Sequence, residues 1–149
     1  MKIDGNYTLE TTPDNFMVLI QDPETVKKVT PGIMELEETG PNRYTIVSEV
    51  RIGPVNGKFK GTLAVNLKEE ENTCVLEVDQ KGDMGNVVAE IDMKLLAISK
   101  TKIIAKYKGE ARVSGKLASM GQRMMSGVVS TLSKQFFKDM EKELKAKQH

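Results

Sequence analysis

Regular alternation of apolar and polar side chains over residues 33–113 is the feature that most constrains the fold of this chain. The alternation is interrupted at short turn-forming segments, at residues 40–42, 53–57, 69–72, 82–83 and 99–100. A period of two with one apolar face is typical of strands in an antiparallel sheet that is covered on one side. The sequence therefore predicts six consecutive antiparallel strands whose apolar faces point to the same side.

One more strand and two short helices are predicted before this sheet. Residues 3–11 alternate in the same way. Thr12-Pro13 and Asp22-Pro23 each combine a side chain that can cap a helix with a proline that suits the first helical position. We therefore expect one helix over residues 13–21, and a second from Pro23 to the segment Thr30-Pro31-Gly32.

A long C-terminal helix is predicted to cover the sheet. Residues 115–145 contain no proline. The predicted buried stripe comprises Leu117, Gly121, Met124, Val128 and Leu132, with Met125, Val129, Phe136 and Met140 beside it. A helix of about 30 residues is ~45 Å long, enough to cross a sheet. The expected fold is α+β and forms a single domain over residues 1–149, with about seven antiparallel strands in a curved sheet wrapped around this helix.

Composition argues against several classes of function. The 149 residues carry 22 basic and 21 acidic side chains, so the net charge of +1 gives no general attraction to nucleic acid. The single histidine is His149, at a chain end that cannot hold an imidazole in fixed geometry. Cys74 is the only cysteine, which fits a reducing compartment and excludes an intramolecular disulfide. We expect a cytoplasmic protein with no metal site, no resident cofactor and no catalytic constellation.

Several segments together resemble a known family. They are Asp22-Pro23-Glu24, Pro31-Gly32, Gly53-Pro54-Val55 with Gly57 and Phe59, and residues 115–121 leading to Phe136-Phe137. In order and spacing the chain resembles the carbon monoxide dehydrogenase G-subunit family, within the polyketide cyclase/START-like superfamily. This resemblance implies a helix-grip fold, in which an apolar ligand is held between the curved sheet and the long helix.

The resemblance also implies a function. It suggests a non-enzymatic accessory protein of a molybdenum-containing carbon monoxide dehydrogenase, acting in membrane recruitment of the enzyme or in its coupling to quinone. Some family members continue into a linker and a membrane-anchoring tail, and this sequence ends at His149, so anchoring of that kind is not expected. A relative serving another redox enzyme, or a lipid binder without such a partner, stays open.

Candidate ligand contacts are methionines, other apolar residues and a few polar residues on the predicted inner faces. Methionine suits a wall that must fit an irregular apolar guest, although it also fills gaps in ordinary cores. Polar side chains in an apolar pocket orient a ligand, although each can equally be satisfied by backbone or water. Inward glycines at Gly61, Gly109 and Gly121 leave space, or let the sheet bend. The predicted ligand-binding residues are Met34, Tyr44, Ser48, Phe59, Leu63, Gln80, Met93, Tyr107, Met120, Met124 and Val128.

Three interpretations of function follow. The leading one is binding of a quinone or lipid-like molecule. An enzyme of the cyclase or hydrolase type, using Tyr107, Tyr44 or a pocket carboxylate as acid or base, is the second. An interaction adaptor that binds no ligand is the third. A basic stripe along the last helix, formed by Lys116, Arg123, Lys134, Lys138, Lys142 and Lys145, suggests peripheral contact with the inner face of the cell membrane, although such a stripe is more often an ordinary solvated face.

Overall fold

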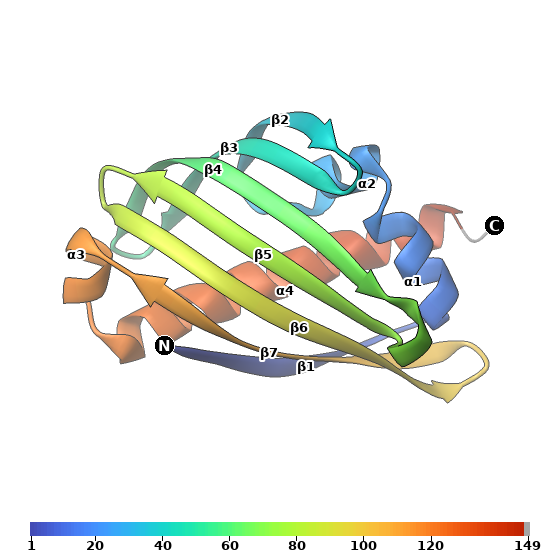
Figure 1. The fold of residues 1–149 in the computed structure, drawn as a ribbon. Helices are drawn as coiled ribbons and strands as arrows, with labels where there is room; N and C mark the ends of the chain where they lie inside the picture. The colour runs from blue at the N-terminus through green and yellow to red at the C-terminus, as the bar shows by residue number, and fades with distance from the viewer. Residues whose placement is uncertain (148–149) are drawn as a thin grey trace.

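The computed structural model describes residues 1–147, so the terminal His149 lies outside the described residues. A seven-stranded antiparallel sheet with the order β1-β7-β6-β5-β4-β3-β2 curves around one face of a long helix, as Figure 1 shows. The strands are β1 (Lys2–Leu9), β2 (Ile33–Gly40), β3 (Arg43–Ile52), β4 (Val55–Lys68), β5 (Thr73–Gly82), β6 (Gly85–Ser99) and β7 (Lys102–Val113). A short 3-10 turn, η1 (Glu69–Glu71), joins β4 to β5. The predicted fold class and strand order are confirmed.

Two short helices connect β1 to β2, as the sequence predicts. Helix α1 (Pro13–Ile20) begins after Thr12, whose Oγ1 accepts a hydrogen bond from the Asn15 amide at 3.1 Å. Helix α2 (Pro23–Val29) begins after Asp22, whose Oδ1 accepts from the Glu24 amide at 3.1 Å. These caps satisfy amide groups that have no partner within the helix. The buried faces of both helices close one end of the curved sheet (Figure 1).

The C-terminal helix differs from the prediction because it is divided. Helix α3 (Gly115–Ser119) ends before Gly121, which has a φ of 84°, and α4 (Gln122–Lys147) follows. A positive φ ends a right-handed helix, and glycine adopts it without the penalty of a Cβ. Gly121 therefore lies at a helix break and not within a buried helical stripe. Helix α4 buries Met125 and leaves Met124 47% exposed.

Glycines on the inner face allow neighbouring strands to approach closely. A Cβ at Gly61 on β4 would overlap the carbonyl oxygen of Asp79 on β5. A Cβ at Gly109 on β7 would likewise overlap the carbonyl oxygen of Glu90 on β6. Backbone atoms cannot move aside as a flexible side chain can, so only glycine fits these positions. Of the two roles considered for these glycines, the bending of the sheet is the one that these contacts support.

Buried side chains are concentrated toward the two ends of the sheet. Near α1 and α2, one cluster contains Phe16, Leu95, Phe137 and Met140. Near α3, a second cluster contains Val55, Phe59, Leu117 and Met125. Between them, several inward-facing residues of the central strands are only half-buried. The middle of the molecule is therefore packed less completely than its ends.

The glycine geometry gives a stability prediction. Gly61→Ala should lower the free energy of unfolding by about 1–3 kcal/mol, because the new methyl group must push apart two hydrogen-bonded strands. Gly40→Ala is the matched control, since a Cβ there meets nothing within 4 Å and its φ is not positive. Urea unfolding followed by circular dichroism measures both. Equal effects of the two substitutions would contradict the proposed close approach.

Candidate ligand-binding cavity

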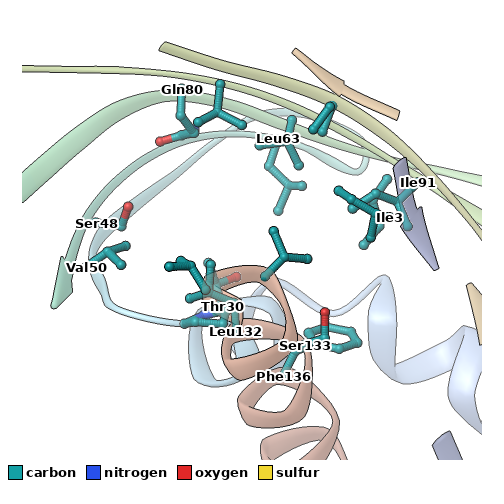
Figure 2. Close-up of a pocket in the computed structure, with 18 of the residues that line it drawn as sticks. Ile3, Thr30, Ser48, Val50, Leu63, Gln80, Ile91, Leu132, Ser133 and Phe136 are labelled. Atoms are coloured by element: carbon teal, nitrogen blue, oxygen red, sulfur yellow. The ribbon is translucent and has the colours of Figure 1, made fainter. Parts of the chain in front are cut away.

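A cavity of about 310 Å³ lies between the inner face of the sheet and α4. This volume is at the lower end of the range for small-molecule sites, which is roughly 300–1,000 Å³. Figure 2 shows Ser48, Leu63 and Gln80 on the sheet side, with Leu132 and Phe136 of α4 opposite. The cavity therefore lies between the sheet and α4 in the middle of the molecule, which the two end clusters do not fill.

Short side chains on adjacent strands explain why this space is empty. One cross-strand row on the inner face runs from Leu63 through Val78 to Ala89 and Ala111. The row becomes smaller toward β7, because its last two side chains are alanines. The inward side chains of Leu63 and Val78 are half-buried and line the cavity. The cavity is therefore associated with the small side chains that the strand register places in this row.

The lining is almost wholly apolar, with few polar side chains. Within residues 1–147, no Asp, Glu, Lys, Arg or His side chain lines the cavity. The side chain of Met1 does line it, but its amino group binds the Ala111 carbonyl oxygen at 2.9 Å and the Glu110 carboxylate at 3.5 Å. An ionised group would be buried here without a counter-charge, which is strongly unfavourable. The cavity therefore suits an uncharged guest.

Two polar side chains, Ser48 and Gln80, lie on the sheet side of the cavity (Figure 2). Both are buried, at 7% exposure. Gln80 Nε2 donates a hydrogen bond to the Thr62 carbonyl oxygen at 3.4 Å, whereas Gln80 Oε1 has no partner among the described residues. Most buried polar atoms have a partner, so this oxygen requires an explanation.

An aromatic cluster bounds the opposite end of the cavity. The Tyr7 and Phe137 rings stack with centroids 5.1 Å apart, and Tyr107 lies 5.5 Å from Phe137. Phe136 meets Phe137 edge-to-face at 5.0 Å. Offset and edge-on ring contacts favour fixed orientations. This end of the cavity has a defined shape, in contrast to a wall of flexible methionines.

The structure brings together seven of the eleven residues predicted to bind a ligand. The predicted residues that line the cavity are Ser48, Phe59, Leu63, Gln80, Met93, Tyr107 and Val128. Their role in binding stays a prediction.

The other four predicted residues lie elsewhere. Met34 on β2 is 49% exposed, and Met124 on α4 is 47% exposed. Met120 packs against the cluster of Leu117 and Met125. Tyr44 is buried beneath α2 with Val26 and Ile46. The expectation that a methionine cluster forms the ligand wall is therefore wrong for these methionines.

The position of Tyr44 also argues against the role of acid or base that the enzyme interpretation gave it. Burial raises the pKa of its hydroxyl above 10.0, and the nearby Glu38 and Asp22 carboxylates raise it further. The group therefore stays protonated at neutral pH and does not face the cavity.

Other lining residues were not among the eleven predicted ligand-binding residues. They include Leu76, Val78, Ile91, Leu132 and Phe136. Their inward direction follows from alternation and helical spacing. The pattern does not distinguish a side chain that borders a void from one that packs against a neighbour, so the sequence offered no signal for selecting them.

Within residues 1–147, no helix is long and apolar enough to span a bilayer. The same residues contain no group of three or more His, Cys, Asp or Glu side chains positioned to hold a metal ion.

The fold and its apolar cavity define a START-like helix-grip protein, and comparisons with known structures support this class. A START superfamily protein from Mycobacterium smegmatis has a TM-score of 0.74 at 13% identity, covering 97% of each chain. The Zhui aromatase/cyclase from Streptomyces sp. R1128 has a TM-score of 0.71 at 10% identity, covering 100% of this chain and 96% of that one. At these identities the likeness shows the fold alone.

The family follows from sequence. The model for the carbon monoxide dehydrogenase G-subunit family (CoxG) matches residues 5–145, so the chain belongs to this family. A conserved protein from Geobacillus kaustophilus is 30% identical, with a TM-score of 0.91 over 98% of this chain and 96% of that one. No curated protein sequence matches the chain. The family resemblance seen in the sequence is confirmed.

The buried thiol of Cys74 gives a prediction about reactivity. Its side chain is fully buried among Met93, Leu95 and other core residues, and burial raises the pKa of the thiol to about 12. Only the thiolate reacts readily, so Ellman's reagent at pH 8 should label native protein far more slowly than protein unfolded in guanidinium chloride. Rapid labelling of the native state would show that this part of the core opens easily.

Proposed function

We propose that this protein binds a single uncharged apolar molecule, of the quinone or lipid type, in the cavity between the sheet and α4. The observation that carries the proposal is the cavity itself, which no Asp, Glu, Lys, Arg or His side chain of residues 1–147 lines. Removing apolar ligand surface from water stabilises binding by about 25 cal/mol per Å² before the costs of association. A carrier requires no catalytic group in such a cavity.

Family membership supplies the biological context of the proposal. As a CoxG family member, the protein would serve a carbon monoxide dehydrogenase-type redox enzyme, with a molybdenum-containing enzyme as the expected partner. An apolar carrier could link such an enzyme to a membrane quinone pool. Native mass spectrometry of protein purified from its own host, followed by extraction of bound molecules, tests this proposal. A protein free of ligand that also fails to bind quinones, quinols and fatty alcohols in thermal-shift assays would contradict it.

The two alternative functions have less support. The cyclase or hydrolase interpretation calls for an acid or base facing the cavity, and Tyr107 is the phenol among the lining residues. Some proteins of this fold are enzymes, such as the aromatase/cyclase above. However, no carboxylate among residues 1–147 faces this cavity. An adaptor that binds no ligand would have no need of the void.

A cavity-filling substitution tests where the ligand binds. Val78→Phe should weaken binding of the uncharged dye Nile red by at least about tenfold, because the new ring occupies the space for the guest. Val88→Phe is the matched control, since Val88 lies on the neighbouring strand, pairs with Asp79 and is exposed on the outer face. Dye fluorescence measures binding, and circular dichroism checks folding. Equal affinity of the two variants would exclude this cavity as the site.

Membrane contact forms a further part of the proposal. Lys134, Lys138 and Lys142 are exposed along α4, whereas Lys116 lies on α3, beyond the break at Gly121. Lys28 of α2 pairs with Glu143 of α4 at 3.8 Å, so its charge is offset. Lys134, Lys138 and Lys142 form a basic surface at the C-terminal half of α4. Such a surface attracts anionic lipid headgroups.

Charge removal tests the contribution of this basic surface. Each lysine near an anionic bilayer contributes about 1 kcal/mol, so changing Lys134, Lys138 and Lys142 to Gln should lower vesicle affinity by at least about tenfold. The control changes Lys58, Lys60 and Lys81 to Gln, because these lysines lie on the outer face of the sheet. Sedimentation with phosphatidylglycerol vesicles at two salt concentrations provides the measurement. Equal losses in both variants would argue against a specific docking surface.

A further inference from the structure

We infer that the ligand is neutral and donates a hydrogen bond from a hydroxyl group to Gln80 Oε1. This inference rests on the proposed function. Gln80 is buried, with 7% of its surface exposed, its side chain lines the cavity, and its Oε1 has no partner among the described residues. An amide oxygen accepts hydrogen bonds and cannot donate them. A bound hydroxyl would supply the missing donor, and an apolar guest would leave the oxygen unsatisfied.

The orientation of the Gln80 amide is set by the sheet. Its Nε2 donates to the Thr62 carbonyl oxygen at 3.4 Å. If the amide were turned over, Oε1 would face that carbonyl, and two acceptors would be placed together without a proton between them. The hydrogen bond to β4 therefore determines that the oxygen, and not the nitrogen, is the end of the amide left without a partner.

Gly61 is the inner-face neighbour of Gln80 on β4. It is paired with Gln80 on one side and with Ile46 on the other, so no side chain stands between those two residues. Ser48, two residues beyond Ile46 on β3, also lines the cavity on this side (Figure 2). A hydroxyl can both donate and accept. Ser48 can therefore assist the same head group but does not determine its polarity.

Because Gln80 Oε1 can only accept a hydrogen bond, it distinguishes between ligands that are otherwise similar. A quinone carbonyl and an ether oxygen are acceptors only and would oppose Oε1, whereas a quinol or an alcohol has the required donor. A fatty acid anion lacks the donor and would also bring an uncompensated charge into the cavity. Within the quinone and lipid classes, the site thus favours the reduced, hydroxyl-bearing forms.

Matched probes test this inference directly. One pair is 2-naphthol and 2-methoxynaphthalene, which represents an aromatic quinol head, and the other is 1-dodecanol and its methyl ether, which represents a lipid alcohol. Calorimetric titration of the wild-type protein should show the hydroxyl member bound about tenfold more tightly in at least one pair. The pair with the greater affinity identifies which kind of hydroxyl the cavity accepts.

Gln80→Met is the decisive variant, because methionine has a similar length and lacks the amide. It should abolish the preference for the hydroxyl member while leaving the ether bound at least as tightly as in the wild type. Retained ether binding also shows that the cavity is intact. Equal affinities within both pairs, or a preference that survives in the variant, would overturn the inference and leave the proposed carrier function standing. Failure of all four probes and of Nile red to bind the wild type would instead contradict the proposed function.

Discussion

The close contact between strand backbones at Gly61 and Gly109 is the constraint on which the remaining structure depends. At both positions a Cβ would overlap a carbonyl oxygen of the adjacent strand. The resulting curvature lets a single sheet wrap around α4, with packed clusters at both ends. Between these clusters the cavity separates part of the sheet from the helix, and the short side chains of Ala89 and Ala111 line it. Stability is thus provided at the ends, and a binding volume remains between them.

Much of this architecture was predictable because it follows from local rules. Alternation determines which side chains of a strand face the helix, and Thr12 and Asp22 cap their helices through contacts within three residues. Seven of the predicted site residues reach the cavity because their inward direction is a local property. The position of the void is not local. It depends on which side chains from several strands meet in one row, such as Leu63, Val78, Ala89 and Ala111.

The backbone at Gly121 explains why the last helix was predicted as continuous. The pattern predicted one helix over residues 115–145 with Met124 in its buried stripe, whereas the φ of 84° at Gly121 ends α3 before α4 begins. Met125 is buried instead, and Met124 faces solvent. A glycine in an otherwise helical pattern is compatible with either a continuous or a broken helix. The choice depends on the tertiary contacts of α3 with β6, which a single-sequence pattern does not contain.

Carriers and catalysts on this fold can differ through a few lining residues, because the scaffold alone does not determine chemistry. Acid–base catalysis needs a titratable group within reach of a proton on the substrate. In residues 1–147 the carboxylates lie outside the cavity, and the raised pKa of Tyr44 belongs to a hydroxyl buried under α2. The unpartnered oxygen of Gln80 is different in kind, because an amide neither gains nor loses a proton near neutral pH. It can recognise a guest and orient it, but it cannot transform it. The polar chemistry of this cavity is therefore the chemistry of selective binding.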